Sequence, residues 1–229
     1  MNHEKMQAHE LQQTSGLKPW LENFWYHYKW QTILVAFLLF TVIVCTAQCV
    51  SETPTDMTVT YAGNFMFSDA EQKGFNNVLS DTCTHDVDGN GDSAVALGSF
   101  AIYDEEQLTE LYTYVDPETG ETKVDKSSMM AAKQYNTERI QTLRTYVMTG
   151  DCAVWFVSPY VYETMLEGKV RVTEKVALKD TALYRSFDAV KALPEDTVVV
   201  LIYPTLGAYS KSDAYALAEE YFRTIVGTN

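Results

Sequence analysis

The segments TVVVLIY (Thr197–Tyr203) and CAVWFV (Cys152–Val157) decide the fold class. Both are apolar over most of their length and lack the alternation of polar and apolar residues that marks a half-exposed strand. Such runs are typical of strands that are buried on both faces, as in a sheet covered by helices on each side. The two segments therefore predict two central strands of an α/β sheet.

Strands and helices alternate along the rest of residues 57–229. The expected strands cover residues 57–62, 94–103 and parts of 170–178, with an exposed hairpin at 112–115 and 121–124. The expected helices cover residues 69–79, 104–111, 127–148, a short stretch after 159, 183–192 and 212–226. Ser68 and Glu71 form a capping box before the first of these helices, and Gly150 is a left-handed cap after the long one. This order predicts one three-layer α/β domain with a largely parallel sheet.

Upstream of that domain, QTILVAFLLFTVIVCTAQCVS (Gln31–Ser51) contains no charged residue. About 20 residues are needed to cross a bilayer core of roughly 30 Å. The aromatic cluster FWYHYKW (Phe24–Trp30) matches the belt that forms at a membrane interface. The 30 residues before the apolar run are long for a signal peptide, and no A-x-A site follows it. We therefore expect an uncleaved transmembrane helix at residues 31–51.

Flanking charges predict the orientation of this helix. Lys18 and Lys29 precede it, whereas Glu52 and Asp56 are the first charges after it. The positive-inside bias places the N-terminus in the cytoplasm. The expected organisation in the cell membrane is a cytoplasmic tail (1–30), a single transmembrane helix (31–51), a tether (52–56) and an extracellular domain (57–229).

The charge of the chain argues against one class of partner. Residues 1–50 carry three lysines and three glutamates, so the net charge of −14 falls on residues 51–229. Affinity for nucleic acid comes mostly from cationic side chains that neutralise phosphates. A domain this acidic is not expected to bind nucleic acid.

The segment QTLRTYVMTGDCAVWFVSPY (Gln141–Tyr160) resembles part of the bacterial extracellular solute-binding proteins, in which a helix ends in a Gly-Asp turn before a buried strand. The segment LENFWYHYKW (Leu21–Trp30) looks like the juxtamembrane part of single-pass proteins of Gram-positive bacteria. The resemblance implies that the outer domain corresponds to one lobe of a periplasmic-binding-protein fold. Family members clamp a ligand between two lobes, so a single lobe implies recognition or assembly rather than transport.

The loop DVDGNGD (86–92) has the features of a calcium loop. It carries oxygen ligands at alternate positions and a glycine at the sixth, as in the first half of an EF-hand. Leu97 occupies the twelfth position, where an EF-hand requires a bidentate Glu, so the loop is not an EF-hand. A shorter calcium loop that takes a carboxylate from elsewhere and a solvated Asp/Asn/Gly turn both remain open. The candidate calcium ligands are Asp86, Asp88, Asn90 and Asp92.

Cys83 and Cys152 are the two cysteines outside the apolar segment. Each lies beside the end of an expected helix, at the same edge of a parallel sheet. An oxidising exterior would allow a disulfide, and closing a loop of about 70 residues would stabilise the fold by roughly 4 kcal/mol. Two unpaired thiols are the alternative. A zinc site made of Cys83, His85, Asp86 and Asp88 is a further, less favoured hypothesis.

The loops after the two central strands are the first place to expect a ligand, because open α/β sheets bind ligands at the carboxyl ends of strands. These loops are Ser158–Tyr160 and Pro204–Tyr209. The candidate ligand-binding residues are Tyr160, Thr205 and Tyr209. Alternatively, these aromatic residues complete a small core and its edges.

Residues 57–229 offer little for catalysis. His85 is the sole histidine there, and the chain has no G-x-S-x-G, P-loop or G-x-G-x-x-G motif. We therefore expect a non-catalytic recognition or assembly module that has no cofactor other than the calcium considered above. Its expected partners are the membrane, through residues 31–51, and envelope proteins or a small solute. The alternatives are an envelope hydrolase that uses paired carboxylates and an accessory subunit of a membrane complex.

Overall fold

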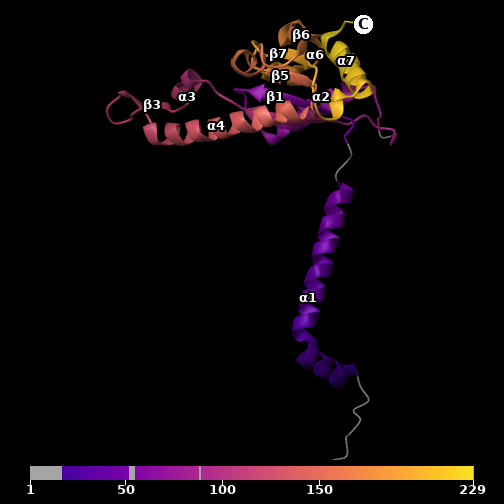
Figure 1. Ribbon diagram of the computed structural model, residues 1–229. Coiled ribbons are helices and arrows are strands. Elements are labelled where there is room, and N and C mark those ends of the chain that lie inside the picture. The colour runs from indigo at the N-terminus through magenta and orange to yellow at the C-terminus, as the bar shows by residue number, and fades with distance from the viewer. Residues whose placement is uncertain (1–16, 52–54, 88, 229) are drawn as a thin grey trace, which may run out of the picture. The chain divides into compact units, whose positions relative to one another are not determined.

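Figure 1 shows the computed structural model, which describes residues 17–51, 55–87 and 89–228. The chain forms two compact units, residues 1–53 and residues 54–229. The first unit contains the single helix α1 (Leu17–Ser51). The second contains all the strands that the structure describes.

Helix α1 contains a span, Phe24–Thr46, that is long and apolar enough to cross a membrane. Its 23 residues correspond to about 35 Å at 1.5 Å per residue. Thr41 and Thr46 donate hydrogen bonds to the carbonyls of Phe37 and Val42, one turn earlier, at 2.9 and 2.8 Å. Those bonds give both hydroxyl groups a hydrogen-bond partner within the helix, so neither needs water. The span starts inside the aromatic cluster, seven residues before the expected start at Gln31, and residues 1–16 of the expected tail lie outside the described residues.

The second unit is built on a five-stranded sheet in the order β2-β1-β5-β7-β6. Its strands are β1 (Met57–Gly63), β2 (Val95–Ala101), β5 (Val154–Val157), β6 (Val172–Ala177) and β7 (Val198–Ile202). Strand β1 pairs in parallel with β2 and β5, whereas β7 is antiparallel to both β5 and β6. Among the described strands of this sheet, β7 alone therefore runs against the others. The expected α/β class and mostly parallel sheet are confirmed.

Helices cover both faces of the sheet and form two separate hydrophobic clusters. Helices α2 (Asp69–Thr82), α6 (Ala182–Ser186) and α7 (Ser212–Val226) pack in the first cluster. Helices α4 (Lys126–Thr149) and α5 (Pro159–Val161) contribute to the second. Strand β5 serves both, because Val154 and Phe156 enter the first cluster while Trp155 and Val157 enter the second. This division explains why the strand is apolar without alternation.

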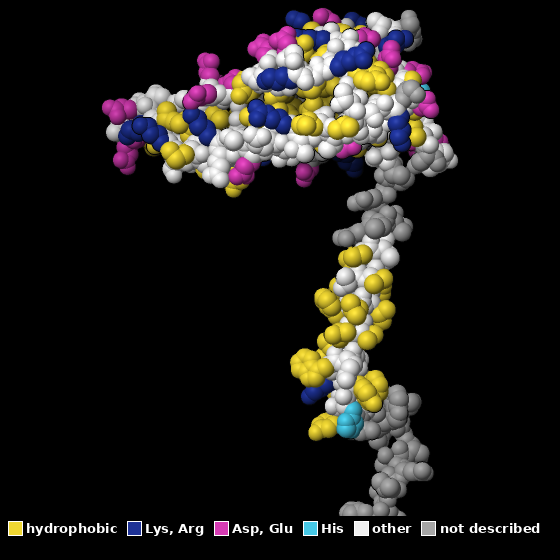
Figure 2. Space-filling view, viewed as in Figure 1, with side chains coloured by type: hydrophobic (Ala, Val, Ile, Leu, Met, Phe, Trp, Pro, Cys, Tyr) yellow, Lys and Arg dark blue, Asp and Glu magenta, His cyan; other side chains and the backbone are white. Residues whose placement is uncertain are grey.

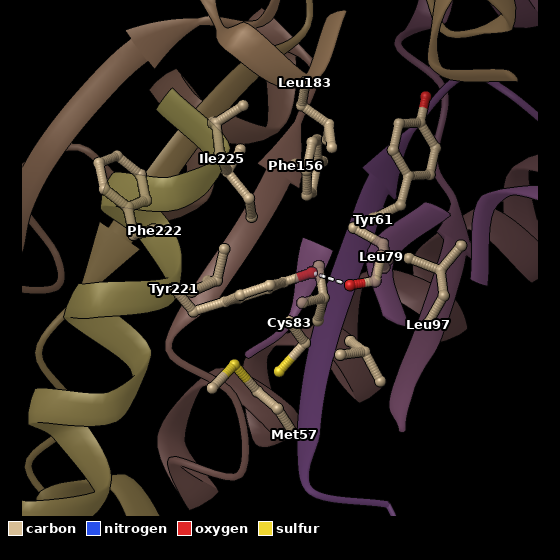
Figure 3. Packing of buried hydrophobic residues seen from close by; sticks show 14 of the residues in the cluster. Met57, Tyr61, Leu79, Cys83, Leu97, Phe156, Leu183, Tyr221, Phe222 and Ile225 are labelled. Atoms are coloured by element: carbon tan, nitrogen blue, oxygen red, sulfur yellow. Dashed lines mark hydrogen bonds between the residues drawn. The ribbon is translucent and has the colours of Figure 1, made fainter. Parts of the chain in front are cut away.

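The first cluster joins α7 to α2 over one face of the sheet. Figure 3 shows Tyr221 of α7 reaching Leu79, and Ile225 of the same helix lying near Phe156. The fully buried Tyr221 hydroxyl donates a hydrogen bond to the carbonyl of Leu79 at 2.7 Å. That bond gives the buried phenol a partner and ties the last helix to the first helix of the domain.

Local sequence signals place most of the element ends. The capping box of Ser68 and Glu71 is present, and α4 ends at Gly150 in the left-handed conformation with φ 68°. The expected helix at 183–192 is instead α6 followed by the 3-10 helix η3 (Asp188–Ala192). Phe187 separates them in an extended conformation, with φ −131°, and packs against the first cluster. Packing of that partly buried ring therefore outweighs the helical propensity of the segment.

Three short elements remain. The π-helix η1 (Tyr162–Leu166) and the 3-10 helix η2 (Leu178–Asp180) lie between strands, and the 3-10 helix η4 (Ala208–Ser210) lies between β7 and α7.

An extension, which we call the arm, consists of residues 104–136. It contains α3 (Glu105–Leu111), the hairpin strands β3 (Thr113–Val115) and β4 (Thr122–Val124), and the first half of α4. The hairpin is a separate two-stranded sheet, as expected, and Figure 1 shows it at the end of α4 that lies away from the main sheet.

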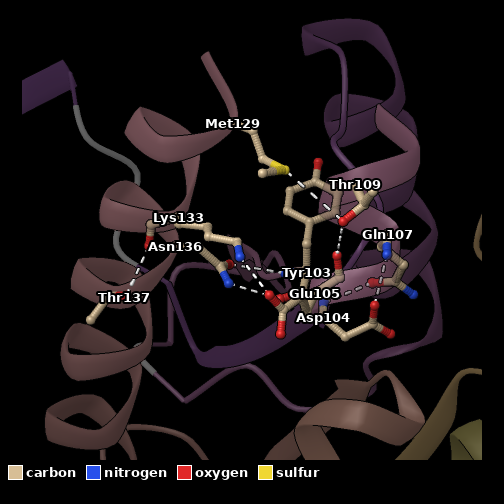
Figure 4. Close-up of polar contacts among 9 residues, drawn as sticks. All are labelled: Tyr103, Asp104, Glu105, Gln107, Thr109, Met129, Lys133, Asn136 and Thr137. Carbon is tan, nitrogen blue, oxygen red and sulfur yellow. Dashed lines mark hydrogen bonds and ion pairs between the residues drawn. The ribbon is translucent and has the colours of Figure 1, made fainter. Parts of the chain in front are cut away.

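Polar contacts fasten the base of the arm (Figure 4). The Asn136 side chain donates to the carbonyl of Tyr103 at 2.7 Å and accepts from its amide at 3.0 Å. Lys133 forms an ion pair with Glu105 at 2.5 Å, which lowers the pKa of that carboxyl group. Helix α3 is therefore held against α4 by backbone-directed bonds, which fix its position more firmly than surface ion pairs alone.

Candidate functional site

Two adjoining cavities lie beside the C-terminal turns of α4. One is about 320 Å³ and the other about 520 Å³ in volume. They share four lining residues, so they form one continuous depression, which we call the basic groove. Its described lining residues are Arg144, Val147, Met148, Met165, Gly168, Lys169, Val170, Arg171, Ile202, Tyr203, Pro204 and Thr205.

Three segments that are distant in sequence build this groove: the end of α4, the turn before β6 and the end of β7. The amide of Tyr203 donates to the carbonyl of Arg171 at 2.8 Å, which joins the last two of these segments. The amide of Ile202 donates to the carbonyl of Ala153 at 2.9 Å, which ties β7 to the start of β5. Since both bonds are between backbone groups, the walls of the groove are part of the sheet framework.

The groove has an unusual charge for this chain. Arg144, Lys169 and Arg171 line it, and its described lining residues include no Asp or Glu. The whole chain has 31 acidic and 17 basic residues. None of the three cations forms an ion pair with a described carboxylate. Figure 2 shows a hollowed apolar area on this face of the domain bordered by Lys and Arg side chains.

Neighbouring groups position two of these cations. The Arg171 guanidinium lies over the Tyr203 ring, 4.7 Å from its centroid. The Lys169 ammonium donates to the carbonyl of Thr164. The floor between the cations is apolar and includes Val147, Met165 and Val170. Cations beside an apolar surface bind anions more strongly than cations in open water do, because the local dielectric is lower. The groove is therefore suited to an anionic group attached to an apolar one.

A separate cavity of about 270 Å³ contains Asp56, Asp151 and Tyr209 among its lining residues. One Asp56 oxygen accepts from the amide of Val87 and the other from the amide of Ala94, both at 2.7 Å. Asp56 therefore closes the 86–94 loop. The Tyr209 hydroxyl accepts weakly from the amide of Thr58 at 3.4 Å, and burial raises the pKa of Tyr209 to about 12. These three hydrogen bonds give Asp56 and Tyr209 a structural role at this cavity.

The structure does not bring the three expected ligand residues together. Thr205 lines the basic groove, whereas Tyr209 lines the separate cavity. Tyr160 follows β5 and packs against the second hydrophobic cluster. Because β7 is antiparallel to β5, the loop after β7 lies at the opposite edge of the sheet from the loop after β5. The sequence of a single strand does not show whether the strand runs parallel or antiparallel to its neighbours.

The acidic loop is ordered by its own backbone amides. One Asp86 oxygen accepts from Gly89 and Asn90 at 2.7 and 3.1 Å, and the other accepts from Gly91 at 2.8 Å. The Asn90 side chain accepts from the amide of Asp92 at 2.8 Å. This pattern is that of an Asp/Asn/Gly turn. Asp88 lies outside the described residues, and within them no group of three or more His, Cys, Asp or Glu side chains could hold a metal ion. Calcium binding stays a prediction.

Cys83 and Cys152 are both free and buried, so the expected disulfide is not present. Cys83 packs with Met57 in the first cluster, as Figure 3 shows, and Cys152 belongs to the second. The Cys152 thiol donates to the carbonyls of Val154 and Thr58 at 3.1 and 3.2 Å. The two clusters lie on opposite faces of the sheet, because consecutive residues of β5 alternate between them. The sheet therefore separates the two thiols.

Among the described residues, the candidate zinc ligands Cys83 and His85 are likewise not brought together as a metal site. His85 directs its Nε2 atom to Glu220 of α7 at 3.2 Å. The Cys83 sulfur lies 3.7 Å from the carbonyl oxygen of His85 and buried in the core. Thiol and imidazole therefore have other partners.

The three groove cations were missed at the level of sequence. Lys169 and Arg171 flank one apolar residue in a short turn, and Arg144 lies 25 positions earlier on a helix. The available signal was the pair of cations at Lys169 and Arg171, although Glu167 and Glu174 lie close by in the sequence. That signal is weak, because it does not show which helix contributes the third cation.

Comparison of the chain with protein-family models, with curated proteins and with solved structures finds no match, so the resemblance to solute-binding proteins stays a prediction.

Proposed function

We propose that this protein is a membrane-anchored, non-catalytic recognition module that binds an anionic, partly apolar ligand in the basic groove. In this proposal, α1 spans the cell membrane with its N-terminus in the cytoplasm, and residues 57–229 lie outside. The flanking charges support that orientation, since lysines precede the apolar run and acidic residues follow it.

The observation that carries the proposal is the composition of the groove. In a domain of strongly negative net charge, three cations gather in one depression that no described Asp or Glu lines. Net repulsion disfavours the approach of anions over most of such a surface. An anion that reaches the groove gains charge-assisted hydrogen bonds from two guanidinium groups and one ammonium group. Its apolar part gains contact with the floor.

The composition of the groove also supports binding rather than hydrolysis. A hydrolase with paired carboxylates needs two acids that flank the scissile bond. The described residues of the groove include neither carboxylates nor His, Cys or Ser. In the cavity that does contain two aspartates, both oxygens of Asp56 accept backbone amides.

A fluorescent probe that is both anionic and apolar, 8-anilinonaphthalene-1-sulfonate, tests the proposal. Residues 54–229 form a compact unit that contains both hydrophobic clusters, so this fragment is suitable. The double variant Lys169→Glu/Arg171→Glu is expected to weaken probe binding by about tenfold, or 1.4 kcal/mol. The matched control is Lys179→Glu/Lys211→Glu, which makes the same change in charge at exposed sites outside the groove.

Equal weakening in the two double variants would show that net charge, rather than the groove, controls binding. Absence of probe binding to the unchanged fragment would also contradict the proposal. Circular dichroism of each variant verifies that the fold is retained.

A further inference from the structure

The hairpin at the end of the arm is exposed along β3, whereas β4 is partly buried. All three residues of β3 are exposed, and the side chains of Tyr114 and Val115 are 50% and 64% exposed. A two-stranded hairpin is marginally stable in water unless another surface covers it. The open edges of such strands also favour association. These features indicate a partner for the hairpin.

The turn of the hairpin is acidic and preorganised. Asp116 accepts hydrogen bonds from the amides of Glu118 and Thr119 at 2.9 and 3.3 Å, and it also pairs with Lys123. The bond from Lys123 lowers the pKa of Asp116. Glu118 and Glu121 are exposed and form no ion pair with a described cation. A rigid acidic turn loses little conformational entropy when it binds.

We infer that the basic groove receives the hairpin tip, residues 113–124, of a second copy of this chain. The inference builds on the proposed function and names the ligand of the groove. Glu118 and Glu121 supply the anionic groups, and Tyr114 and Val115 supply the apolar part. On the accepting copy, Arg144, Lys169 and Arg171 meet the carboxylates. Met148, whose side chain is 69% exposed, meets the apolar residues.

Charge favours this occupant over pairing between two hairpins. The tip carries Asp116, Glu118 and Glu121 against a single cation, Lys123. Two tips side by side would place like charges opposite each other, which is destabilising. Two copies of a domain with net negative charge also repel each other over most of their surface. Contact between the tip and the groove brings opposite charges together.

The helix α4 relates the two surfaces within one copy. Its N-terminal residue, Lys126, follows the hairpin, and its last turns contribute Arg144 and Met148 to the groove. Eighteen residues of helix separate Lys126 from Arg144, a distance of about 27 Å. A tip therefore does not reach the groove of its own copy. Because the two contacting surfaces differ, the association is head to tail and forms rings or open chains.

Photo-crosslinking of the full chain in lipid nanodiscs that hold several copies tests this inference. Tyr114 is replaced with p-benzoylphenylalanine, which reacts readily with C–H bonds next to sulfur. We expect crosslinked dimers in which mass spectrometry locates the adduct at Met148 or Met165.

Charge-reversal variants test the contact between tip and groove. Glu118→Lys/Glu121→Lys in the tip, or Lys169→Glu/Arg171→Glu in the groove, should reduce the dimer yield about tenfold. The tip variant and the groove variant combined in one chain should restore most of the dimer yield. Glu106→Lys/Glu110→Lys makes the same charge change on α3 and should have little effect.

Three outcomes would overturn the inference. They are adducts only to lipid or to other proteins, adducts elsewhere on the second copy, and failure of the combined charge reversal to restore the yield. Naphthalene sulfonate binding to the same variants separates this inference from the proposed function. If the probe binds in the groove but no dimer forms, the groove binds anions and the second copy is not its ligand. If neither probe binding nor dimer formation is seen, both proposals fail.

Discussion

Gly150 and Gly207 lie backbone against backbone, where the turn after α4 meets the loop after β7. A Cβ atom on Gly150 would overlap the carbonyl oxygen of Leu206, and one on Gly207 would overlap that of Thr149. The amide of Tyr209 donates to the carbonyl of Gly150 at 3.4 Å. This approach holds the end of α4, and with it Arg144 and Met148, against the β7 side of the basic groove.

Replacing either glycine with alanine should therefore destabilise the domain strongly. Both have positive φ angles, 68° and 81°, and both lack space for a methyl group. We expect Gly150→Ala and Gly207→Ala each to lower the free energy of unfolding by about 2–4 kcal/mol. Urea denaturation measures this loss in the free energy of unfolding. Gly120→Ala is the control, because Gly120 has a similar φ of 69° but open space around it. A loss no larger than the control's would argue against the close approach.

Removing the Tyr221 hydroxyl should have a smaller effect. It donates to the Leu79 carbonyl at 2.7 Å, and the Thr82 hydroxyl also donates to that carbonyl at 2.9 Å. In Tyr221→Phe the carbonyl keeps one partner, so we expect a loss of about 1 kcal/mol. Phe222→Ala removes a fully buried ring and should cost about 3–5 kcal/mol. If the two variants lost the same stability in urea denaturation, this account of the first cluster would be wrong.

The two buried cysteines should be unreactive thiols in the folded domain. Burial raises the pKa of Cys83, and it raises the pKa of Cys152 to about 12, so little thiolate forms at neutral pH. Iodoacetamide should therefore alkylate neither residue until the protein is unfolded. After unfolding without a reductant, peptide mass spectrometry should find both alkylated. A peptide pair linked through Cys83 and Cys152 would show that the disulfide forms after all.

Stability should fall at alkaline pH. Burial raises the pKa of Cys152 from 9.0 to about 12 and that of Tyr209 from 10.0 to about 12. Burial also raises the pKa values of Tyr61 and Tyr221. The folded state retains these protons over a range in which the unfolded state releases them. The stabilisation is therefore complete below pH 9.0 and declines as the pH rises toward 12. Urea midpoints between pH 7 and 11 measure this decline, which Tyr209→Phe should make less steep.

Calcium binding by the acidic loop can be separated from its hydrogen bonding. Asp86→Ala removes the two oxygens that accept from three backbone amides, and it should lower the melting temperature in the presence of a chelator. If the loop also binds calcium, millimolar calcium should raise the melting temperature of the unchanged domain and leave that of Asp88→Ala unchanged. A melting temperature that does not respond to calcium would contradict the prediction that the loop binds calcium.

The sequence alone determined the local features of this protein. The uncharged run from Gln31 predicts an apolar helix, and the capping box at Ser68, the cap at Gly150 and the apolar segment 152–157 each predict their element correctly. In each case the cause is short-range: the polarity of consecutive residues, a side chain that satisfies a nearby amide, or a backbone angle that glycine tolerates. Neighbours along the chain are sufficient to specify such features.

The tertiary structure alone decided which distant residues meet. The antiparallel direction of β7 puts Thr205 and Tyr160 at opposite edges of the sheet. The sheet itself separates Cys83 from Cys152. The pairing of Tyr203 with Arg171 completes the groove beside Arg144. Strand direction and pairing depend on contacts between segments far apart in the chain. The same apolar run is compatible with either direction, because burial on both faces stabilises parallel and antiparallel strands alike.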